Sequence, residues 1–268
     1  MKLAESTRNV KVSGAENISD FGVSQEGMPI LMEIMSNKIY SDKPMAVIRE
    51  YSCNAADANT ENGKADTPIH VTLPNRMEPV LKIRDTGKGL SFEEIMETYI
   101  QYGTSTKRGS NNMIGCLGLG SKSGFAYGDS FVITSWNDGV KSVYSAFRGA
   151  DKTFKMAALG KPEKDASDSG IEIQIPIRNE DVGTIVTKAL TFFQHWDVRP
   201  TFSGADMNFK KQPVVIEGVD WKILESDHYS YGSECQAVMG KIAYPINLKM
   251  MSSDNFANED WAAIQYMV

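Results

Sequence analysis

Cysteine and histidine are scarce in this sequence, which has three of each among 268 residues. The cysteines are odd in number and lack the paired spacing of zinc ligands, which argues against a disulfide framework or a zinc knuckle. This usage fits a reducing compartment, so we expect a cytoplasmic protein. Cys53 is expected to pack as a small apolar group. The histidines have no neighbouring ligands, and structural or surface roles are predicted for His70, His195 and His228.

Long apolar runs and an excess of positive charge are also missing. No window approaches 18 consecutive apolar residues, and the first residues, MKLAESTRNV, lack the apolar core of a signal peptide. The net charge of -6 argues against nucleic acid as the main partner. The last residues, EDWAAIQYMV, end in a partly apolar stretch without a capping Gly or Pro, so we expect a truncated chain.

The composition, 41% hydrophobic and 23% charged, is that of a folded domain. Apolar spacing predicts a helix over 28–40, and Ser41-Asp42 predicts the cap of a second helix that ends at Asn62-Gly63. A hairpin is predicted to turn at Asn137-Asp138-Gly139. Residues 101–112 have no apolar period and are expected to form a mobile loop. Strands are predicted at 69–73, 79–84, 130–136, 140–147 and 171–177, and further helices at 91–100 and 180–195.

A row of polar residues interrupts the second predicted helix. Glu50, Asn54 and Asp57 stand at i, i+4 and i+7, so a helix places them on one face. Two acids and an amide on an otherwise apolar helix are costly to bury unless they hold a ligand or water. A solvated polar stripe on a surface helix explains the same spacing, which leaves both interpretations open.

A glycine loop, DTGKG, follows the strand predicted at 79–84. Asp85 offers acceptor oxygens to an N–H donor such as an exocyclic amine, while Gly87 and Gly89 allow the backbone to turn sharply and approach a ligand. A plain turn between a strand and a helix explains an isolated D-x-G-x-G more simply.

A second glycine-rich stretch, IGCLGLGSKS, precedes a helical pattern. Gly115, Gly118 and Gly120 predict a loop whose backbone N–H groups and helix N-terminus favour phosphate, and Lys122 adds a positive charge. A P-loop is the alternative. Lys122 stands one position too late for it, and the preceding SNNM is polar, so the strand that a P-loop requires is missing.

In this order and spacing, the three motifs resemble the GHKL (Bergerat-fold) ATPase superfamily, which includes gyrase B, MutL and Hsp90-like proteins. The resemblance covers roughly residues 28–178. Residues 35–59 and 114–135 are also closely similar to phage rIIA-like rapid-lysis-inhibitor proteins. The resemblance implies an α+β fold, a Bergerat-type α/β sandwich with a mixed, mostly antiparallel sheet backed by helices. This ATP-binding domain is expected over residues 1–205, and residues 206–268 are expected to begin a strand-containing, transducer-like second domain.

The resemblance implies a role for each motif residue. Glu50 is then the general base for the attacking water, Asn54 the Mg²⁺ ligand, and Asp57 a support of that site. Asp85 accepts from the adenine amine. Gly87 and Gly89 allow the close approach, and the phosphates are bound by the loop of Gly115, Gly118, Gly120 and Ser121, with Lys107 from a closing lid and Lys122 as cationic contacts.

The sequence departs from the superfamily pattern at two points. A Thr commonly follows the Gly of the last strand motif, whereas Ile171 follows Gly170 here, so Ser169 or a water is expected to replace that hydroxyl. No lysine in 208–268 is identified as the γ-phosphate contact that many relatives supply from the next domain. Slow turnover is therefore expected.

Three functions are open on this resemblance. The first is a Mg²⁺-dependent, slow ATPase that closes a lid and forms a homodimer on binding ATP; the second is a nucleotide-gated interaction switch that scarcely hydrolyses ATP. The Glu at the start of the N-box and the lack of an upstream phosphoacceptor helix argue against the third, a GHKL histidine kinase. The rIIA-like resemblance alone implies lysis inhibition or anti-exclusion in the host cytoplasm, with an rIIB-like partner, at or near the inner membrane.

Overall fold

The computed structural model describes Ser24 and residues 26–101, 120–210, 213–217, 222–224, 235–239 and 241–246. Contacts divide the chain into two compact units, residues 1–189 with 198–206, and residues 190–197 with 207–268. The second unit contains two antiparallel strand pairs, β8 (Val214–Glu217) with β9 (Lys222–Leu224) and β10 (Cys235–Met239) with β11 (Ile242–Ile246). The assignment of residues 206–268 as a transducer-like domain stays a prediction.

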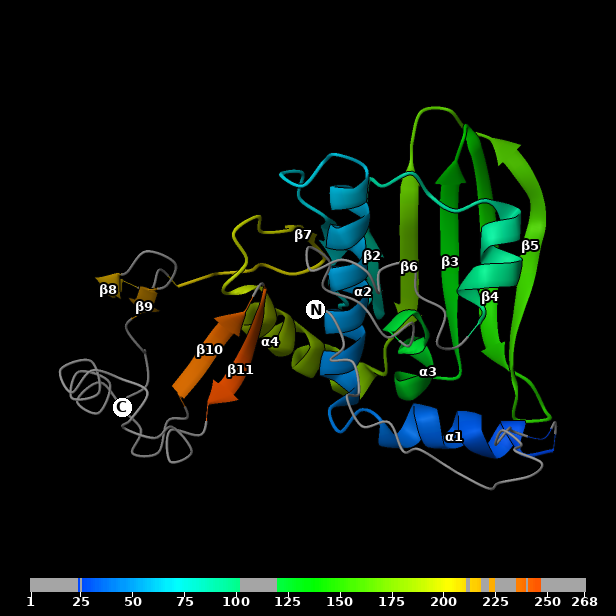
Figure 1. Ribbon diagram of the computed structural model, residues 1–268, viewed down its shortest axis with the longest axis horizontal. Coiled ribbons are helices and arrows are strands. Elements are labelled where there is room, and N and C mark those ends of the chain that lie inside the picture. The colour runs from blue at the N-terminus through cyan, green and yellow to red at the C-terminus, as the bar shows by residue number, and fades with distance from the viewer. Residues whose placement is uncertain are drawn as a thin grey trace, which may run out of the picture. The chain divides into compact units, whose positions relative to one another are not determined.

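The first unit is built on a seven-stranded sheet (Figure 1). Its order is β5-β4-β3-β6-β2-β1-β7, and every neighbouring pair is antiparallel except β1 with β7. The predicted mixed, mostly antiparallel sheet backed by helices is therefore confirmed. The strands are β1 (His70–Thr72), β2 (Val80–Arg84), β3 (Ser130–Asn137), β4 (Val140–Arg148), β5 (Phe154–Lys164), β6 (Gly170–Pro176) and β7 (Thr201–Ser203).

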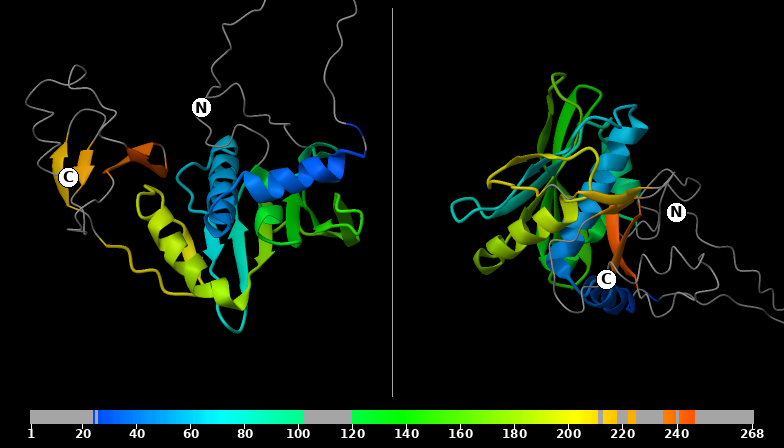
Figure 2. Two further views of the ribbon diagram at one scale, coloured as in Figure 1. Left: turned by 90° about the horizontal axis from the view of Figure 1, so that it is seen from below. Right: turned by 90° about the vertical axis from the view of Figure 1, so that its left-hand side faces the viewer.

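Helix α2 (Lys43–Glu61) packs on one face of this sheet, with the short α3 (Gly124–Tyr127) beside it (Figure 2). Its ends are fixed by local chemistry. The Asp42 carboxylate accepts the Met45 N–H at 3.0 Å, and Pro44 occupies the first turn, where it sacrifices no helical hydrogen bond. At the other end Gly63 takes a φ of +69°, the left-handed conformation that ends many helices. Both predicted helix ends are confirmed.

The core lies between α2 and the sheet. Leu81 and Ile83 alternate with half-buried residues along β2, as expected for a strand with one covered face. Ile173 on β6 lies opposite Ile83, and α2 contributes Val47 and Ile48, each at most 1% exposed. Each such side chain contributes about 1.5–3 kcal/mol when fully buried. This packing fixes the position of α2, which carries the polar row.

Sequence patterns located the β3–β4 hairpin but missed two strands. Asp138 and Gly139 have φ angles of +49° and +75°, as a type I′ turn requires, so the predicted hairpin is confirmed. The missed strands are both at sheet edges. β5 contains Gly160 and Pro162 and exposes most of its side chains, and β7 is three residues long, so neither has an apolar alternation.

The first helix, α1 (Met28–Lys38), confirms the predicted element but does not bury its apolar stripe in the described part of the chain. Ile30 is 64% exposed, Ile34 51% and Leu31 36%. The predicted helix at 91–100 also forms, and Ser91 and Glu94 cap it reciprocally through their side chains and backbone N–H groups. It continues as the π-helical turn η1 (Glu94–Tyr99). The last helix is η3 (Asn179–Asp181) followed by α4 (Val182–Phe193).

Candidate functional site

The polar row of α2 runs from a partly exposed end to a buried one. Glu50 is partly exposed and its Oε1 accepts two hydrogen bonds from the Arg49 guanidinium, at 2.9 and 3.2 Å. Asn54 is partly buried, and Asp57 is only 2% exposed. A solvated surface stripe is therefore the wrong interpretation for Asp57. Burial, with Glu50 nearby, raises the pKa of Tyr40 to about 12, so this phenol stays neutral beside the carboxylate.

The buried carboxylate of Asp85 ends β2 and is held by two backbone amides. Its Oδ1 accepts the N–H of Gly87 at 2.8 Å and the N–H of Ile171, on the neighbouring strand β6, at 3.1 Å. Asp85 is 5% exposed. These two bonds fix the orientation of the carboxylate. The backbone of Ile171, rather than its side chain, makes the contact.

Side chains at the end of α2 and directly after it bind the loop that follows Asp85. The Asn59 side chain accepts the Thr86 N–H at 2.8 Å and donates to the Thr67 carbonyl at 2.9 Å. Asn62 and Lys64 both donate to the Thr86 carbonyl. Sequence reasoning missed Asn59, which is 1% exposed; the only signal was an amide in the last turns of an otherwise buried helix.

Protein atoms lie so close to Gly87 and Gly89 in this loop that a Cβ at either position would crowd them. A Cβ on Gly87 would lie 3.0 Å from the Cβ of Ala58, so this glycine lets the loop touch α2. Gly89 has a φ of +75°, and a Cβ there would lie 2.1 Å from the Trp136 carbonyl. In this structure the two glycines make room for α2 and β3, and their predicted close approach to a ligand stays a prediction.

The end of the glycine-rich stretch lies against the polar row. Lys107, Gly115 and Gly118 lie outside the described residues, so their predicted roles stay predictions. Gly120 begins the 3₁₀ turn η2 (Gly120–Lys122), and a Cβ on it would lie 2.4 Å from Glu50 Oε2. The structure therefore brings the candidate phosphate turn and the candidate base into contact.

Lys122 binds protein groups in this structure. Its Nζ donates to the Gln101 carbonyl at 2.7 Å and lies 5.4 Å from the centroid of the Tyr99 ring. Burial lowers the pKa of this ammonium to about 8. Its predicted contact with a phosphate stays a prediction.

Arg84, the last residue of β2, binds the backbone of Ser169. Its guanidinium donates to the Ser169 carbonyl at 3.0 Å, pairs with the Asp168 carboxylate at 2.6 Å and stacks 3.9 Å from the Trp136 ring centroid. The next residue, Gly170, has a φ of +107°, and a Cβ there would lie 2.6 Å from Asp85 Oδ1. This close approach lets the following amide reach Asp85. The predicted role of the Ser169 hydroxyl stays a prediction.

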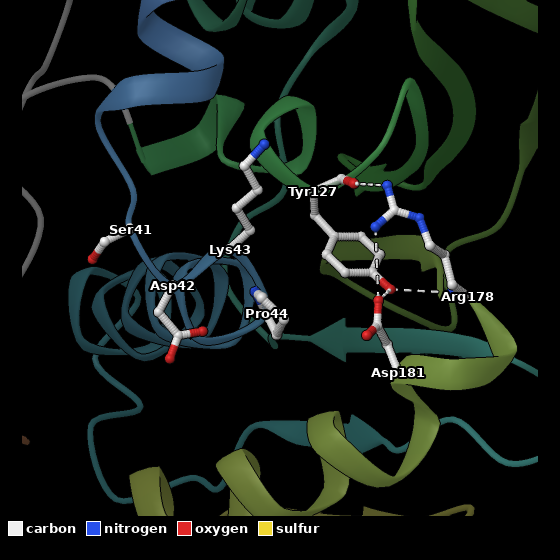
Figure 3. Close-up of a pocket in the computed structure, with 7 residues that line it drawn as sticks. All are labelled: Ser41, Asp42, Lys43, Pro44, Tyr127, Arg178 and Asp181. Carbon is white, nitrogen blue, oxygen red and sulfur yellow. Dashed lines mark hydrogen bonds and ion pairs between the residues drawn. The ribbon is translucent and has the colours of Figure 1, made fainter.

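A separate open pocket of about 430 Å³ lies at the start of α2 (Figure 3). Its polar groups bind one another. The Tyr127 hydroxyl donates to Asp181 at 2.7 Å and accepts the Arg178 N–H at 3.1 Å, and burial together with the Asp181 bond raises the pKa of Tyr127 to about 12. The pocket contains none of the motif residues. It is lined by Ser41, Asp42, Lys43, Pro44, Tyr127, Arg178 and Asp181.

Comparison with known proteins decides the family. Residues 41–184, more than half of the chain, match the family model described as histidine kinase-, DNA gyrase B-, and HSP90-like ATPase. The chain belongs to this ATPase family. It is also 28% identical over 175 residues to an endoplasmin homolog from Dictyostelium discoideum, a match that covers 56% of this chain and 22% of that protein. The ATPase domain thus spans a small part of that relative's length.

The described residues contain no group of three or more His, Cys, Asp or Glu side chains that could hold a metal ion by themselves. None of the helices described in this ATPase domain is both long and apolar enough to cross a membrane. A Mg²⁺ ion that takes most of its ligands from phosphate and water needs only one or two protein oxygens, and Asn54 on α2 offers an amide oxygen of this kind.

Proposed function

We propose that this ATPase domain binds Mg²⁺-ATP between α2, the loop after Asp85 and the turn η2, and hydrolyses it slowly. The observation that carries the proposal is that helix α2 contacts both the loop after Asp85 and the turn η2. Ala58 and Asn59 hold the Asp85 loop, while Glu50 lies against the Gly120 turn. A site for the nucleotide base and a site for its phosphates are thereby held at a fixed spacing.

On the base side, Asp85 is the acceptor for the exocyclic amine of adenine. Its orientation is fixed by two amides before any ligand arrives, so little ordering is needed on binding. An oxygen acceptor also selects against a base that presents a carbonyl at the same position, because two acceptors would face each other.

On the phosphate side, Asn54 holds Mg²⁺ through its amide oxygen, and Asp57 supports that site. When bound there, Mg²⁺ would supply positive charge that offsets the negative charge developing during phosphoryl transfer. Glu50 orients the attacking water and accepts its proton. Backbone amides of the glycine-rich stretch, with Gly115, Gly118, Gly120 and Ser121, bind the phosphates. Lys107 and Lys122 are the proposed cationic contacts.

A nucleotide-gated switch with little hydrolysis is the second candidate, and one contact favours it. The Arg49 guanidinium binds Glu50 Oε1 twice, so this carboxylate oxygen is engaged by the protein in the structure. Hydrolysis requires Glu50 to turn toward the water, so turnover is slow or absent while this ion pair persists.

The wider role is proposed from the sequence resemblance. It comprises lid closure over ATP, a homodimer and an rIIA-like function in lysis inhibition or anti-exclusion. An rIIB-like partner and a place in the host cytoplasm near the inner membrane belong to the same proposal. The family match and the similarity to the endoplasmin homolog support ATPase chemistry of the Hsp90-like kind.

The deciding experiment compares Mg²⁺-ATP binding and phosphate release in the parent chain and in Glu50→Gln. Binding in both chains with release only in the parent supports a slow ATPase with Glu50 as base. Binding in both without release supports the switch. No binding by the parent refutes the proposal, and equal release from both chains refutes the role of Glu50.

A further inference from the structure

Two phenols from separate elements converge on one carbonyl of the turn η2. The Tyr51 hydroxyl, one residue after Glu50 on α2, donates to the Ser121 carbonyl at 3.0 Å and accepts the Gly124 N–H at 3.0 Å. The Tyr99 hydroxyl, at the end of η1, donates to the same carbonyl at 3.0 Å. Burial raises the pKa of both phenols well above the usual value, so both remain neutral donors.

These bonds fix more than one atom of the turn. A carbonyl oxygen has two lone pairs, and the two phenols together engage both. A trans peptide is planar, with its C=O and N–H pointing in opposite directions, so fixing the Ser121 carbonyl also fixes the direction of the Lys122 N–H. The same bonds tie the turn to the residue beside Glu50, and Gly120 lies directly against that carboxylate.

We propose that Tyr51 and Tyr99 are positioning residues for the phosphate side of the site. They orient the amides of η2 and hold the turn against Glu50 without touching the nucleotide. This inference rests on the proposed ATP-binding function. It assigns a task to two tyrosines that are not among the defining positions of the three motifs: Tyr51 stands directly after Glu50 inside the first motif, and Tyr99 lies outside all three.

The two hydroxyls differ in what their removal leaves behind. Tyr99→Phe removes one of two donors to Ser121, so the carbonyl keeps the Tyr51 bond. Tyr51→Phe removes a donor and also leaves the buried Gly124 N–H without this acceptor. Losing a hydrogen bond costs about 1 kcal/mol, a factor of about five in an equilibrium. We therefore expect about fivefold weaker ATP binding for Tyr99→Phe and at least about tenfold weaker binding for the double variant.

The test measures dissociation constants for ATP and for adenosine, which lacks phosphates, in the parent, both single variants and the double variant. Tyr144→Phe is the matched control, because its hydroxyl is buried on β4 and has no hydrogen-bond partner within the described residues. The expected result is weaker ATP binding with adenosine affinity unchanged within about twofold. Phosphate release at saturating ATP should fall as well, and the control should match the parent.

Three results overturn the inference. Equal loss of ATP and adenosine affinity would show a general structural role, and no loss in the double variant would show no role. A parent that binds no ATP would overturn the proposed function itself, which separates the two failures. If Tyr51→Phe does not fold, Tyr99→Phe decides alone, because its change leaves the Gly124 N–H paired.

Discussion

Replacing Asp85 by Asn and by Ala separates its structural task from its proposed task in binding. Asparagine keeps one oxygen in the same place, so the N–H groups of Gly87 and Ile171 retain their acceptor. The other oxygen becomes an NH₂ donor, which would face the amine of adenine. We expect Asp85→Asn to cost about 1 kcal/mol of unfolding free energy, since the bonds lose their ionic character, and to abolish ATP binding.

Alanine removes the acceptor altogether. Both N–H groups would then be left in an environment where Asp85 is only 5% exposed, which gives water little access. Each unpaired buried N–H costs about 1–3 kcal/mol, so Asp85→Ala should lose about 2–6 kcal/mol. This is a large share of the 5–15 kcal/mol that typically separates folded and unfolded states.

Urea unfolding without nucleotide and ATP titration calorimetry measure the two effects. Asp66→Asn, at an exposed position, controls for the loss of one negative charge. Equal destabilisation by Asn and Ala would refute the argument that the two amide bonds, rather than the charge, stabilise this corner. Normal ATP binding by a folded Asp85→Asn would refute its role as the adenine acceptor.

Three further predictions use other parts of the structure. Gly120→Ala places a Cβ 2.4 Å from Glu50 Oε2, the proposed base, and should lower phosphate release at least about tenfold while changing the free energy of unfolding by less than about 1 kcal/mol. Gly183→Ala, with open space around its Cβ, should leave release unchanged in the same assay. Burial lowers the pKa of Lys122 from 10.5 to about 8, so the unfolded chain binds the proton more tightly. Its contribution to the free energy of unfolding should therefore rise between these pH values by up to about 3 kcal/mol. Urea titrations should show this rise in the parent relative to Lys122→Met, and identical pH profiles would contradict it. Ile48 is 1% exposed, so Ile48→Ala should lower the free energy of unfolding by about 2–5 kcal/mol. Ile34 is 51% exposed, so Ile34→Ala should lower it by less than about 0.5 kcal/mol. A large loss of stability in Ile34→Ala would show that the apolar stripe of α1 is covered in solution.

Signals that act within a few residues allowed accurate prediction from the sequence. The Asp42 cap, the Gly63 terminus of α2 and the Asp138-Gly139 turn each depend on local backbone chemistry. The spacing of Glu50 and Asp57 likewise needs only helical geometry. These features survive folding because the tertiary structure agrees with them.

Features that depend on a distant partner could not be predicted in this way. Edge strand β5 pairs along β4 through its backbone, so its side chains carry no clear pattern. Asn59 acts on Thr86, 27 residues away, and its residue type alone does not indicate a partner. At Ile171 the group that binds Asp85 is the main-chain N–H, which every residue except proline has. The departure from Thr at that position therefore does not disturb this anchor.

Helix α2 explains why the two ends of the proposed site belong together. Glu50 and Ala58 are eight residues apart, which is about 12 Å along a helix axis. The first contacts the Gly120 turn, and the second contacts Gly87. A buried helix with both ends capped changes length very little, so the spacing between base and phosphate contacts is set before the nucleotide binds. Adaptation to the ligand must therefore come from the loops attached to α2, and for this reason we expect the hydroxyls that fix η2 to affect the binding of phosphate more than the binding of adenine.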